Sequence, residues 1–151
     1  MGDRAKILLV LLIIGGALWA FHRPPSLHPT LPLAAKGSQP ARVAHGAEID
    51  LANNLVDGKT TVFDFMSKFC GPCEGYNEPL HRLHAQRADI AVVQIDINRP
   101  GLQGIDWISP VAKEFKLQSI PYFKIYGPKG QFVAEGDDAR HKVDAWIAAL
   151  K

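Results

Sequence analysis

The chain of 151 residues has only two cysteines, and its formal net charge is only +2. It has no block of Lys and Arg and no stripe of basic and aromatic residues, so nothing in it points to a nucleic-acid partner. No internal repeat is present either. Hydrophobic residues make up 47% and charged residues 21%, close to the usual mix of a globular protein. These features indicate one folded domain, with room for an appendage.

The N-terminal segment differs from the rest of the chain. Arg4 and Lys6 precede an uncharged run, ILLVLLIIGGALWAF, at residues 7–21. The run is shorter than the roughly 20 apolar residues of a full membrane span, and it fits a signal peptide or a short signal-anchor. We expect residues 1–22 to be kept as an anchor in the inner (cytoplasmic) membrane, with cleavage and secretion as the alternative. The positive charges would stay on the cytoplasmic side and place the following domain in the periplasm or an equivalent extracytoplasmic space.

Residues 23–46 are predicted to be a linker that holds the folded domain away from the membrane. Proline blocks helix formation and supplies no backbone donor to a sheet. Pro-rich stretches are typically extended and semi-rigid. The prolines of this stretch are Pro24, Pro25, Pro29, Pro32 and Pro40.

Residues 47–151 carry the regular patterns of a folded domain. Two apolar, β-rich runs, Thr60–Met66 and Ile90–Ile97, flank a helical stretch within residues 70–87. Strand, helix and strand in this order predict two parallel strands joined by a right-handed crossover. Two shorter runs, Tyr122–Tyr126 and Gln131–Glu135, flank Gly-Pro-Lys-Gly and predict an antiparallel hairpin.

Three further helices are expected in the same domain. They span residues 51–56, 110–116 and 139–150. Ser109 followed by Pro110 is a typical N-cap and first-turn pair. The sequence therefore predicts an α/β fold in which helices flank a central mixed sheet.

Both cysteines of the chain lie in one motif, Cys70-Gly71-Pro72-Cys73, between the first long strand and its helix. A buried pair without chemistry is one interpretation, because free cysteine packs like a small hydrophobe. Gly-Pro is a turn signal, however, and it follows a strand and opens a helix. We therefore expect both thiols to lie near a surface.

A metal site is the second interpretation, because His81 and His84 follow the cysteines. If Cys73 and His81 share one helix, they lie about 12 Å apart along its axis. Ligands of one zinc ion must lie within about 4 Å of each other, so this spacing argues against zinc. A calcium loop beginning at Asp96 is also disfavoured, because Pro100 and Trp107 occupy positions that need ligands. No metal and no organic cofactor is expected.

Redox chemistry is the third interpretation and the one that the context favours. A cysteine at a helix N-terminus faces unpaired N–H groups and the positive end of the helix dipole. Both favour the thiolate, which makes Cys70 a nucleophile at neutral pH. Cys73, one turn further on, is placed to attack a mixed disulfide and release the product.

Residues 47–151 resemble the thioredoxin family, whose active-site tetrapeptide is Cys-Gly-Pro-Cys. The resemblance implies a thioredoxin fold and a protein-disulfide oxidoreductase in which electrons reside in the dithiol. It gives Asp64 the role of the buried acid that accepts and returns the proton of Cys73. Burial of a carboxyl raises its pKa, which suits a proton carrier near neutrality.

The resemblance also predicts residues that present the substrate. Ile120-Pro121 matches the cis-proline segment that faces the cysteines in this fold, where backbone can pair with an extended substrate. Gly136 matches a family glycine near the substrate groove. Phe69 stands where the family usually has Trp. The full predicted substrate-binding set is Phe69, Gly71, Pro72, Ile120, Pro121 and Gly136.

Two further features depart from the family pattern. The family lysine that pairs with the buried acid aligns with Val92, so we expect Asp64 to be harder to ionise than in the relatives. The loop around residues 101–107 is longer than in a minimal thioredoxin. Trp107 in this loop either caps the active-site face and shapes partner choice or fills a gap in the core.

Together these features predict a membrane-tethered thiol-disulfide oxidoreductase, with disulfide reduction as the favoured direction. Its expected partners are client proteins with disulfides or thiols and a membrane electron-donor protein. One alternative is a thiol reductase dedicated to cytochrome c maturation. Others are a module that delivers or assembles copper through two thiolates, and a structural adaptor with an idle redox pair.

Overall fold

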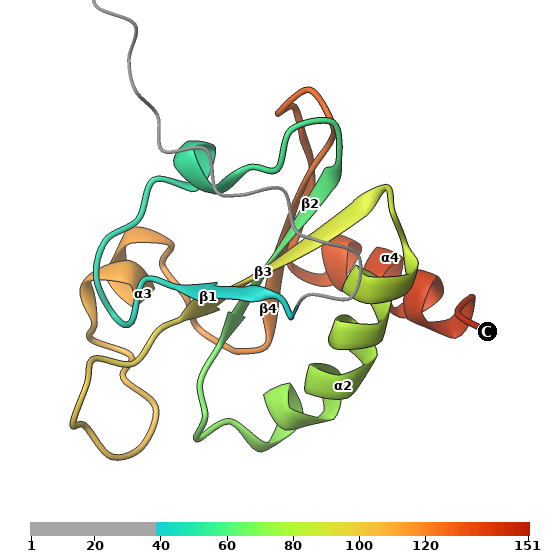
Figure 1. The fold of residues 1–151 in the computed structure, drawn as a ribbon. Helices are drawn as coiled ribbons and strands as arrows, with labels where there is room; N and C mark the ends of the chain where they lie inside the picture. The colour runs from blue at the N-terminus through green and yellow to red at the C-terminus, as the bar shows by residue number, and fades with distance from the viewer. Residues whose placement is uncertain (1–38) are drawn as a thin grey trace, which may run out of the picture.

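The computed structural model describes residues 39–151 of the chain (Figure 1). The predicted anchor, residues 1–22, and most of the predicted linker lie outside the described residues. Within residues 39–151, no helix is both long enough and apolar enough to span a membrane.

A mixed five-stranded sheet forms the centre of the domain, in the order β1-β3-β2-β4-β5. Strands β1 and β2 run parallel to β3, whereas β4 is antiparallel to both β2 and β5. The strands are β1 (Ala41–Val43), β2 (Thr60–Met66), β3 (Ile90–Asp96), β4 (Tyr122–Tyr126) and β5 (Phe132–Glu135). The predicted parallel crossover and the predicted hairpin are both present.

The two inner strands, β2 and β3, are almost entirely buried. Their apolar side chains serve both faces of the sheet, as expected for parallel strands covered on both sides. Phe63 and Phe65 pack on one face, while Val62 packs on the other. Because side chains alternate along a strand, Asp64 of β2 lies on the same face as Val62.

Helices cover both faces of the sheet. The long helices α2 (Gly71–Gln86) and α4 (Gly136–Ala148) lie together on one side, and the short helix α3 (Pro110–Glu114) lies on the other, as Figure 1 shows. A 3₁₀ helix, Leu51–Asn54, packs with the α3 side through Leu51. The resulting layers match the predicted architecture.

The predicted linker, residues 23–46, ends in a strand of the folded domain. Ala41–Val43 forms β1 and pairs with Val93–Ile95 of β3. Pro40 is the last proline of the linker, so the three residues after it keep their backbone N–H groups and can add an edge strand. The folded domain therefore includes β1 and begins before residue 47.

Some helix bounds also differ from those predicted. Helix α4 begins at Gly136 instead of 139, because the polar first turn, Gly-Asp-Asp, carries no apolar periodicity. Asp137 and Asp138 suit the positive end of the helix dipole. The first helix is a 3₁₀ turn that ends at Asn54, two residues earlier than expected.

Candidate active site

Cys70 and Cys73 form a disulfide at the start of α2. The S–S distance is 2.10 Å and the two Cα atoms are 5.3 Å apart. Cys70 is the N-cap of the helix, with an extended backbone, and the backbone N–H of Cys73 donates to Cys70 Sγ at 3.1 Å. Pro72 lies in the first turn, where its missing N–H leaves no helical bond unmade. The helix N-terminus therefore directs a donor at the sulfur of Cys70, as the redox interpretation requires.

The expectation that both thiols lie near the surface was wrong for the side chains themselves. Cys70 is 4% exposed and Cys73 is 2% exposed, and both belong to the buried cluster around Phe65. The residues between them, Gly71 and Pro72, are exposed. The disulfide thus lies directly beneath an exposed turn, and the packing of the cluster covers the sulfur atoms.

The segment before β4 lies against the disulfide. Cys70 Sγ is 3.6 Å from the carbonyl oxygen of Ile120, and the Ile120–Pro121 peptide bond is cis, as the resemblance implied. Ile120 is buried and Pro121 is half-buried. The structure therefore brings these two predicted substrate-binding residues to the redox pair.

Gly136 lies where β5 meets α4. Its φ of +61° is in the left-handed region, which a glycine adopts without steric cost. A Cβ atom there would be 3.6 Å from the ring of Tyr122, the residue that follows Pro121. The residue thus closes the turn beside the start of β4.

Two aromatic residues near this end of the molecule are accessible. Phe69 is half-buried beside Cys70, and Lys68 Nζ lies 4.9 Å from the centre of its ring. Trp107 is 40% exposed, so the expectation that it fills a core gap is excluded. Its loop starts where the backbone N–H of Ile97 donates to the carbonyl of Met66, at the end of β2.

Asp64 is the buried acid of the site. It is 1% exposed and lies in the middle of β2, and burial raises its pKa to about 7. A hydrogen bond from Gln94 and the positive charge of Arg42 oppose this rise. Within residues 39–151, Oδ1 of Asp64 has no hydrogen-bond partner. The pKa of this carboxyl allows it to hold or release a proton near neutral pH.

Val92 does not lie directly opposite Asp64 in the sheet. In the strand register Val92 pairs with Val62, and Gln94 pairs with Asp64. Gln94 Nε2 donates to Asp64 Oδ2 at 3.4 Å and to Asn77 Oδ1 at 3.3 Å. A neutral amide therefore lies opposite Asp64 in β3.

Gln94 and Asn77 place Asp64 beneath the helix face that carries Cys73. Cys73 and Asn77 are four residues apart on α2, so they share one face of that helix. Asn77 reaches the sheet through Gln94, and Asp64 pairs with Gln94 in the sheet. The sequence contained one signal for Gln94, since it is the only polar residue between Ile90 and Ile95 in an otherwise apolar strand.

The histidines do not join the cysteines. Among residues 39–151, no group of three His, Cys, Asp or Glu side chains could hold a metal ion. His84 is buried on the sheet side of α2, where its Nδ1 accepts from the backbone N–H of Val92 at 3.0 Å. His84 therefore has a structural role at the joint between α2 and β3.

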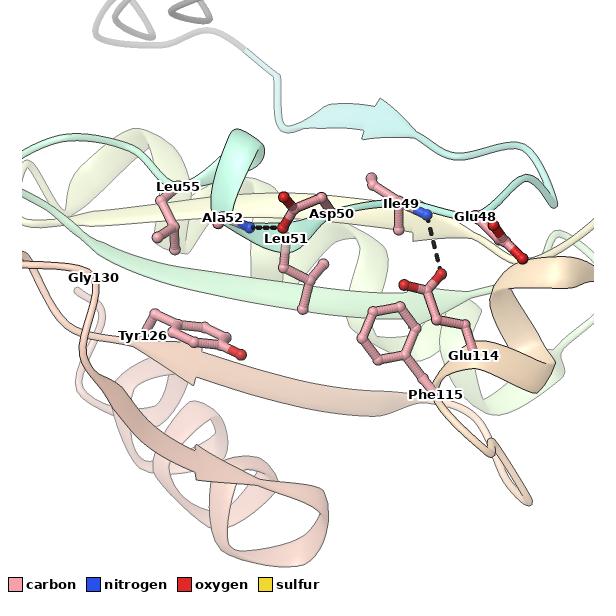
Figure 2. A pocket seen from close by; sticks show the side chains of 10 residues that line it. All are labelled: Glu48, Ile49, Asp50, Leu51, Ala52, Leu55, Glu114, Phe115, Tyr126 and Gly130. Carbon is pink, nitrogen blue, oxygen red and sulfur yellow. Dashed lines mark hydrogen bonds between the residues drawn. The ribbon is translucent and has the colours of Figure 1, made fainter. Parts of the chain in front are cut away.

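A pocket of about 590 Å³ lies on the α3 side of the molecule, away from the predicted site residues (Figure 2). Figure 2 shows Leu51 between the rings of Phe115 and Tyr126. Two carboxylates that line the pocket accept hydrogen bonds from backbone N–H groups: Asp50 from Ala52 N at 2.9 Å, and Glu114 from Ile49 N at 3.0 Å. The pocket is lined by Glu48, Ile49, Asp50, Leu51, Ala52, Leu55, Glu114, Phe115, Tyr126 and Gly130. None of these residues belongs to the redox site.

Known proteins share this fold. The thioredoxin family model matches residues 45–149. The chain is 30% identical to thioredoxin H-type of Fagopyrum esculentum over 91 residues, which cover 57% of the chain and 71% of that protein.

Solved structures agree with this match at the level of the fold. One is thioredoxin from Trypanosoma brucei brucei, with a TM-score of 0.53, 18% identity, and coverage of 74% of this chain and 89% of that one. Another is a complex of ferredoxin:thioredoxin reductase with thioredoxin f2, where the match has a TM-score of 0.50 and 22% identity and covers 76% and 98%. The disulfide at the start of α2, the fold around it and these matches lead to one conclusion: the chain belongs to the thioredoxin family and is a thiol-disulfide oxidoreductase.

Proposed function

We propose that the protein is a disulfide reductase that acts on protein disulfides outside the cytoplasm and is held at the membrane by its N-terminal segment. The observation that carries the chemistry is the Cys70–Cys73 disulfide at the N-terminus of α2, with Cys70 Sγ 3.6 Å from the Ile120 carbonyl. The motif is the oxidised half of a two-electron couple. Its reduced half holds the electrons that a client disulfide receives.

The first step uses Cys70 as the nucleophile. Its thiolate attacks one sulfur of the client disulfide, a bond forms between Cys70 and the client, and the other client sulfur leaves as a thiolate that takes up a proton. The N–H of Cys73 points at Cys70 Sγ and stabilises negative charge there. The helix dipole acts in the same direction.

The second step uses Cys73 and Asp64. The carboxylate of Asp64 accepts the proton of the Cys73 thiol, and the Cys73 thiolate attacks Cys70 Sγ. The Cys70–Cys73 bond forms, the mixed disulfide breaks, and the second client sulfur leaves as a thiolate that takes up a proton. The client gains two electrons and two protons, and the enzyme is left oxidised. The pKa of Asp64, near 7, supports this exchange at neutral pH.

The client is bound by the surface around the disulfide. The carbonyl of Ile120 lies beside Cys70, where it can accept from the backbone of an extended client segment. Phe69 and the exposed turn of Gly71 and Pro72 border the same place. Pro121 directly precedes β4 and Gly136 directly follows β5. We propose that these two residues shape the strand ends that border this surface.

The direction of electron flow rests on the residues between the cysteines. Gly-Pro resembles the reducing members of the family. A reductase in an oxidising compartment needs an electron source, and we propose a membrane protein as that donor. A reductase partner has a parallel in the solved complex that joins thioredoxin f2 with ferredoxin:thioredoxin reductase.

A redox titration of the Cys70/Cys73 couple tests the direction. A reduction potential of about −270 mV is expected for a reductase, whereas a value of about −120 mV would indicate an oxidase. Turnover of a model protein disulfide, with a dithiol as electron donor, should accompany the reducing value. The Cys70→Ser variant is the matched control and should show background rates.

The location is tested separately from the chemistry. A reporter enzyme that needs disulfides for activity, fused after Lys151 of the full chain, should be active in intact cells and fractionate with membranes. An inactive reporter would place the domain in the cytoplasm. An active reporter in the soluble extracytoplasmic fraction would show that the leader is cleaved.

A further inference from the structure

Three side chains form a polar row across three neighbouring strands. Arg42 of β1 pairs with Gln94 of β3, and Gln94 pairs with Asp64 of β2, so the three lie at matching positions of the sheet. They also share one face of the sheet, because Gln94 bonds to both of the others. The row runs from exposed Arg42 at the sheet edge to fully buried Asp64.

The hydrogen bonds along this row have a fixed direction. Arg42 Nη2 donates to Gln94 Oε1 at 3.2 Å, and Gln94 Nε2 donates to Asp64 Oδ2 at 3.4 Å. A guanidinium group has donors and no acceptor. The oxygen of the Gln94 amide must therefore face Arg42, and its NH₂ group must face Asp64. Asn77 supports this orientation, because its Oδ1 accepts from the same NH₂ group.

The orientation of the Gln94 amide decides which form of Asp64 it favours. An N–H directed at the carboxyl stabilises the charged carboxylate. With the amide reversed, its oxygen would face the carboxyl, accept a proton from the acid form and repel the carboxylate. Gln94 thus acts in opposite directions in its two orientations, and Arg42 selects one of them.

We propose that Arg42 and Gln94 are positioning residues that set when Asp64 releases its proton, with Arg42 acting through the orientation of the Gln94 amide. The proposal deepens the proposed function, because Asp64 is the proton acceptor assigned to Cys73. In this chain a neutral amide, hydrogen-bonded to an arginine of the edge strand, lies opposite the buried acid.

Few other groups within the described part of the chain compete for this role. Oδ1 of Asp64 has no partner there, so Gln94 supplies the hydrogen bond that the carboxyl receives. Strand β4 places Phe123 opposite Asp64, and Cys73 of α2 is tied up in the disulfide.

Tyr76 of α2 and its partner on α4, Asp144, complete the charged and titratable surroundings. Tyr76 donates to Asp144 Oδ1 at 2.7 Å. If the hydroxyl of Tyr76 ionised, its negative charge would interact with Asp64. Its pKa is raised to about 12, so Tyr76 stays neutral where Asp64 titrates.

The test is a titration of Asp64 in the oxidised full-length chain, where no thiol titrates. Aspartate carboxyl carbons labelled with ¹³C are followed by NMR against pH, and the Asp64 signal is assigned by its loss in Asp64→Asn. We expect Gln94→Leu to raise the midpoint by about one pH unit, since the carboxylate loses its donor. Arg42→Met should raise it by roughly half that amount or more, because the amide is free to reverse.

The double variant separates the two ways in which Arg42 could act. If Arg42 acts mainly through Gln94, adding Arg42→Met to Gln94→Leu should move the midpoint by much less than Arg42→Met does alone, the remainder being the direct effect of the arginine charge. Full additivity would overturn the proposal, because it would show that the arginine acts only by its charge through space. An unchanged midpoint in Gln94→Leu would also overturn it.

Two further variants make the test robust. Gln94→Met removes the amide and keeps an unbranched side chain, so it replaces Gln94→Leu if that variant fails to fold. Arg82→Met, on the exposed side of α2, removes an arginine that does not contact Gln94 and should leave the midpoint unchanged.

Failure of the proposed function would look different. The pH profile of the step that releases the client should shift in Gln94→Leu in parallel with the NMR midpoint. If the midpoint moves and the pH profile does not, the positioning network stands and the role of Asp64 as proton acceptor falls.

Discussion

Two buried aspartates of this protein have opposite surroundings. Asp64, under α2, is 1% exposed, and it accepts a hydrogen bond from the neutral amide of Gln94. Asp106, in the loop between β3 and α3, is 5% exposed and faces Arg99, which donates to Oδ2 through Nε at 2.7 Å and to Oδ1 through Nη2 at 3.0 Å. Burial raises the pKa of Asp64 to about 7, whereas the hydrogen bonds from Arg99 lower the pKa of Asp106.

The two carboxyl groups differ in whether they can change protonation near neutral pH. A carboxylate held by a guanidinium keeps its charge and fixes a loop. A carboxyl without a cation in contact changes its protonation near neutral pH and can exchange a proton with a thiol. Burial alone therefore does not tell these two carboxyl groups apart; the hydrogen-bond donor of each one does.

The largest expected effect distinguishes the two regions by activity. Cys70→Ser should reduce protein-disulfide turnover to the uncatalysed rate, because only a thiolate at this position can attack the client. Asp106→Asn should keep most of the wild-type turnover, because no residue of the loop between β3 and α3 takes part in the proposed thiol-disulfide exchange. Turnover by Cys70→Ser above background would contradict the assignment of Cys70.

Replacing Asp64 should stabilise the protein at neutral and alkaline pH. The pKa of Asp64 is about 7 in the folded chain and 3.8 in its ordinary state, a difference of about three pH units. At 1.36 kcal/mol per unit, this difference corresponds to about 4 kcal/mol. The unfolded chain ionises first as pH rises, so the wild type loses this stability between about pH 4 and pH 7.

Denaturant unfolding of oxidised Asp64→Asn and wild type measures this effect. At pH 8 the variant should be more stable by up to about 4 kcal/mol. The gap should narrow from pH 7 to pH 4 and close below about pH 3, where Asp64 is protonated in both states. A gap of the same size at pH 8 and at about pH 3 would show that Asp64 does not titrate as described.

Asp106→Asn should have the opposite sign. The variant weakens the bonds that hold residues 98–106, and we expect a loss of about 1–3 kcal/mol at neutral pH. Because the folded pKa of Asp106 is lowered, its contribution is present above the ordinary carboxyl pKa and is lost as pH falls through the folded value. In the same unfolding series, the free energies of unfolding of Asp106→Asn and wild type should converge at acidic pH. A variant as stable as wild type at pH 7 would show that Asp106 does not stabilise the loop.

The smallest expected effect concerns the surface of the loop. Trp107, Leu102 and Ile108 are exposed apolar side chains on it. We expect Trp107→Ala to change stability by less than about 0.5 kcal/mol and to raise KM for a protein client by a few-fold. Turnover of a small disulfide should stay the same. Phe132→Ala, an exposed position on β5, is the matched control, and an equal effect there would remove Trp107 from client binding.

Much of the fold followed from the sequence because its main signals are local. Thr60–Met66 and Tyr122–Tyr126 were predicted with the bounds that the structure shows. Strand β1 was missed, because three residues beside Pro40 carry no periodic pattern and become a strand only by pairing with β3. Pairing between segments about 50 residues apart cannot be recognised from local composition.

The candidate site was predictable where one motif holds it. Cys70 and Cys73 lie in a four-residue pattern, and Asp64 lies six residues before them. Gln94 and Arg42 were not predicted, because their role depends on strand register. Only the register of β2 and β3 shows that Gln94 lies opposite Asp64.

The central claim is that the disulfide, although its cysteines are 4% and 2% exposed, opens and closes while the domain stays folded. The direct measurement is alkylation of the full-length chain after treatment with a stoichiometric dithiol in native buffer, read by mass spectrometry. The account predicts that both thiols appear without denaturant and that Cys70 is labelled first. In a parallel sample that is not alkylated, replacing the dithiol with oxidised glutathione should restore the closed form. If neither cysteine reacts until the protein is unfolded, the pair is structural and the account is wrong.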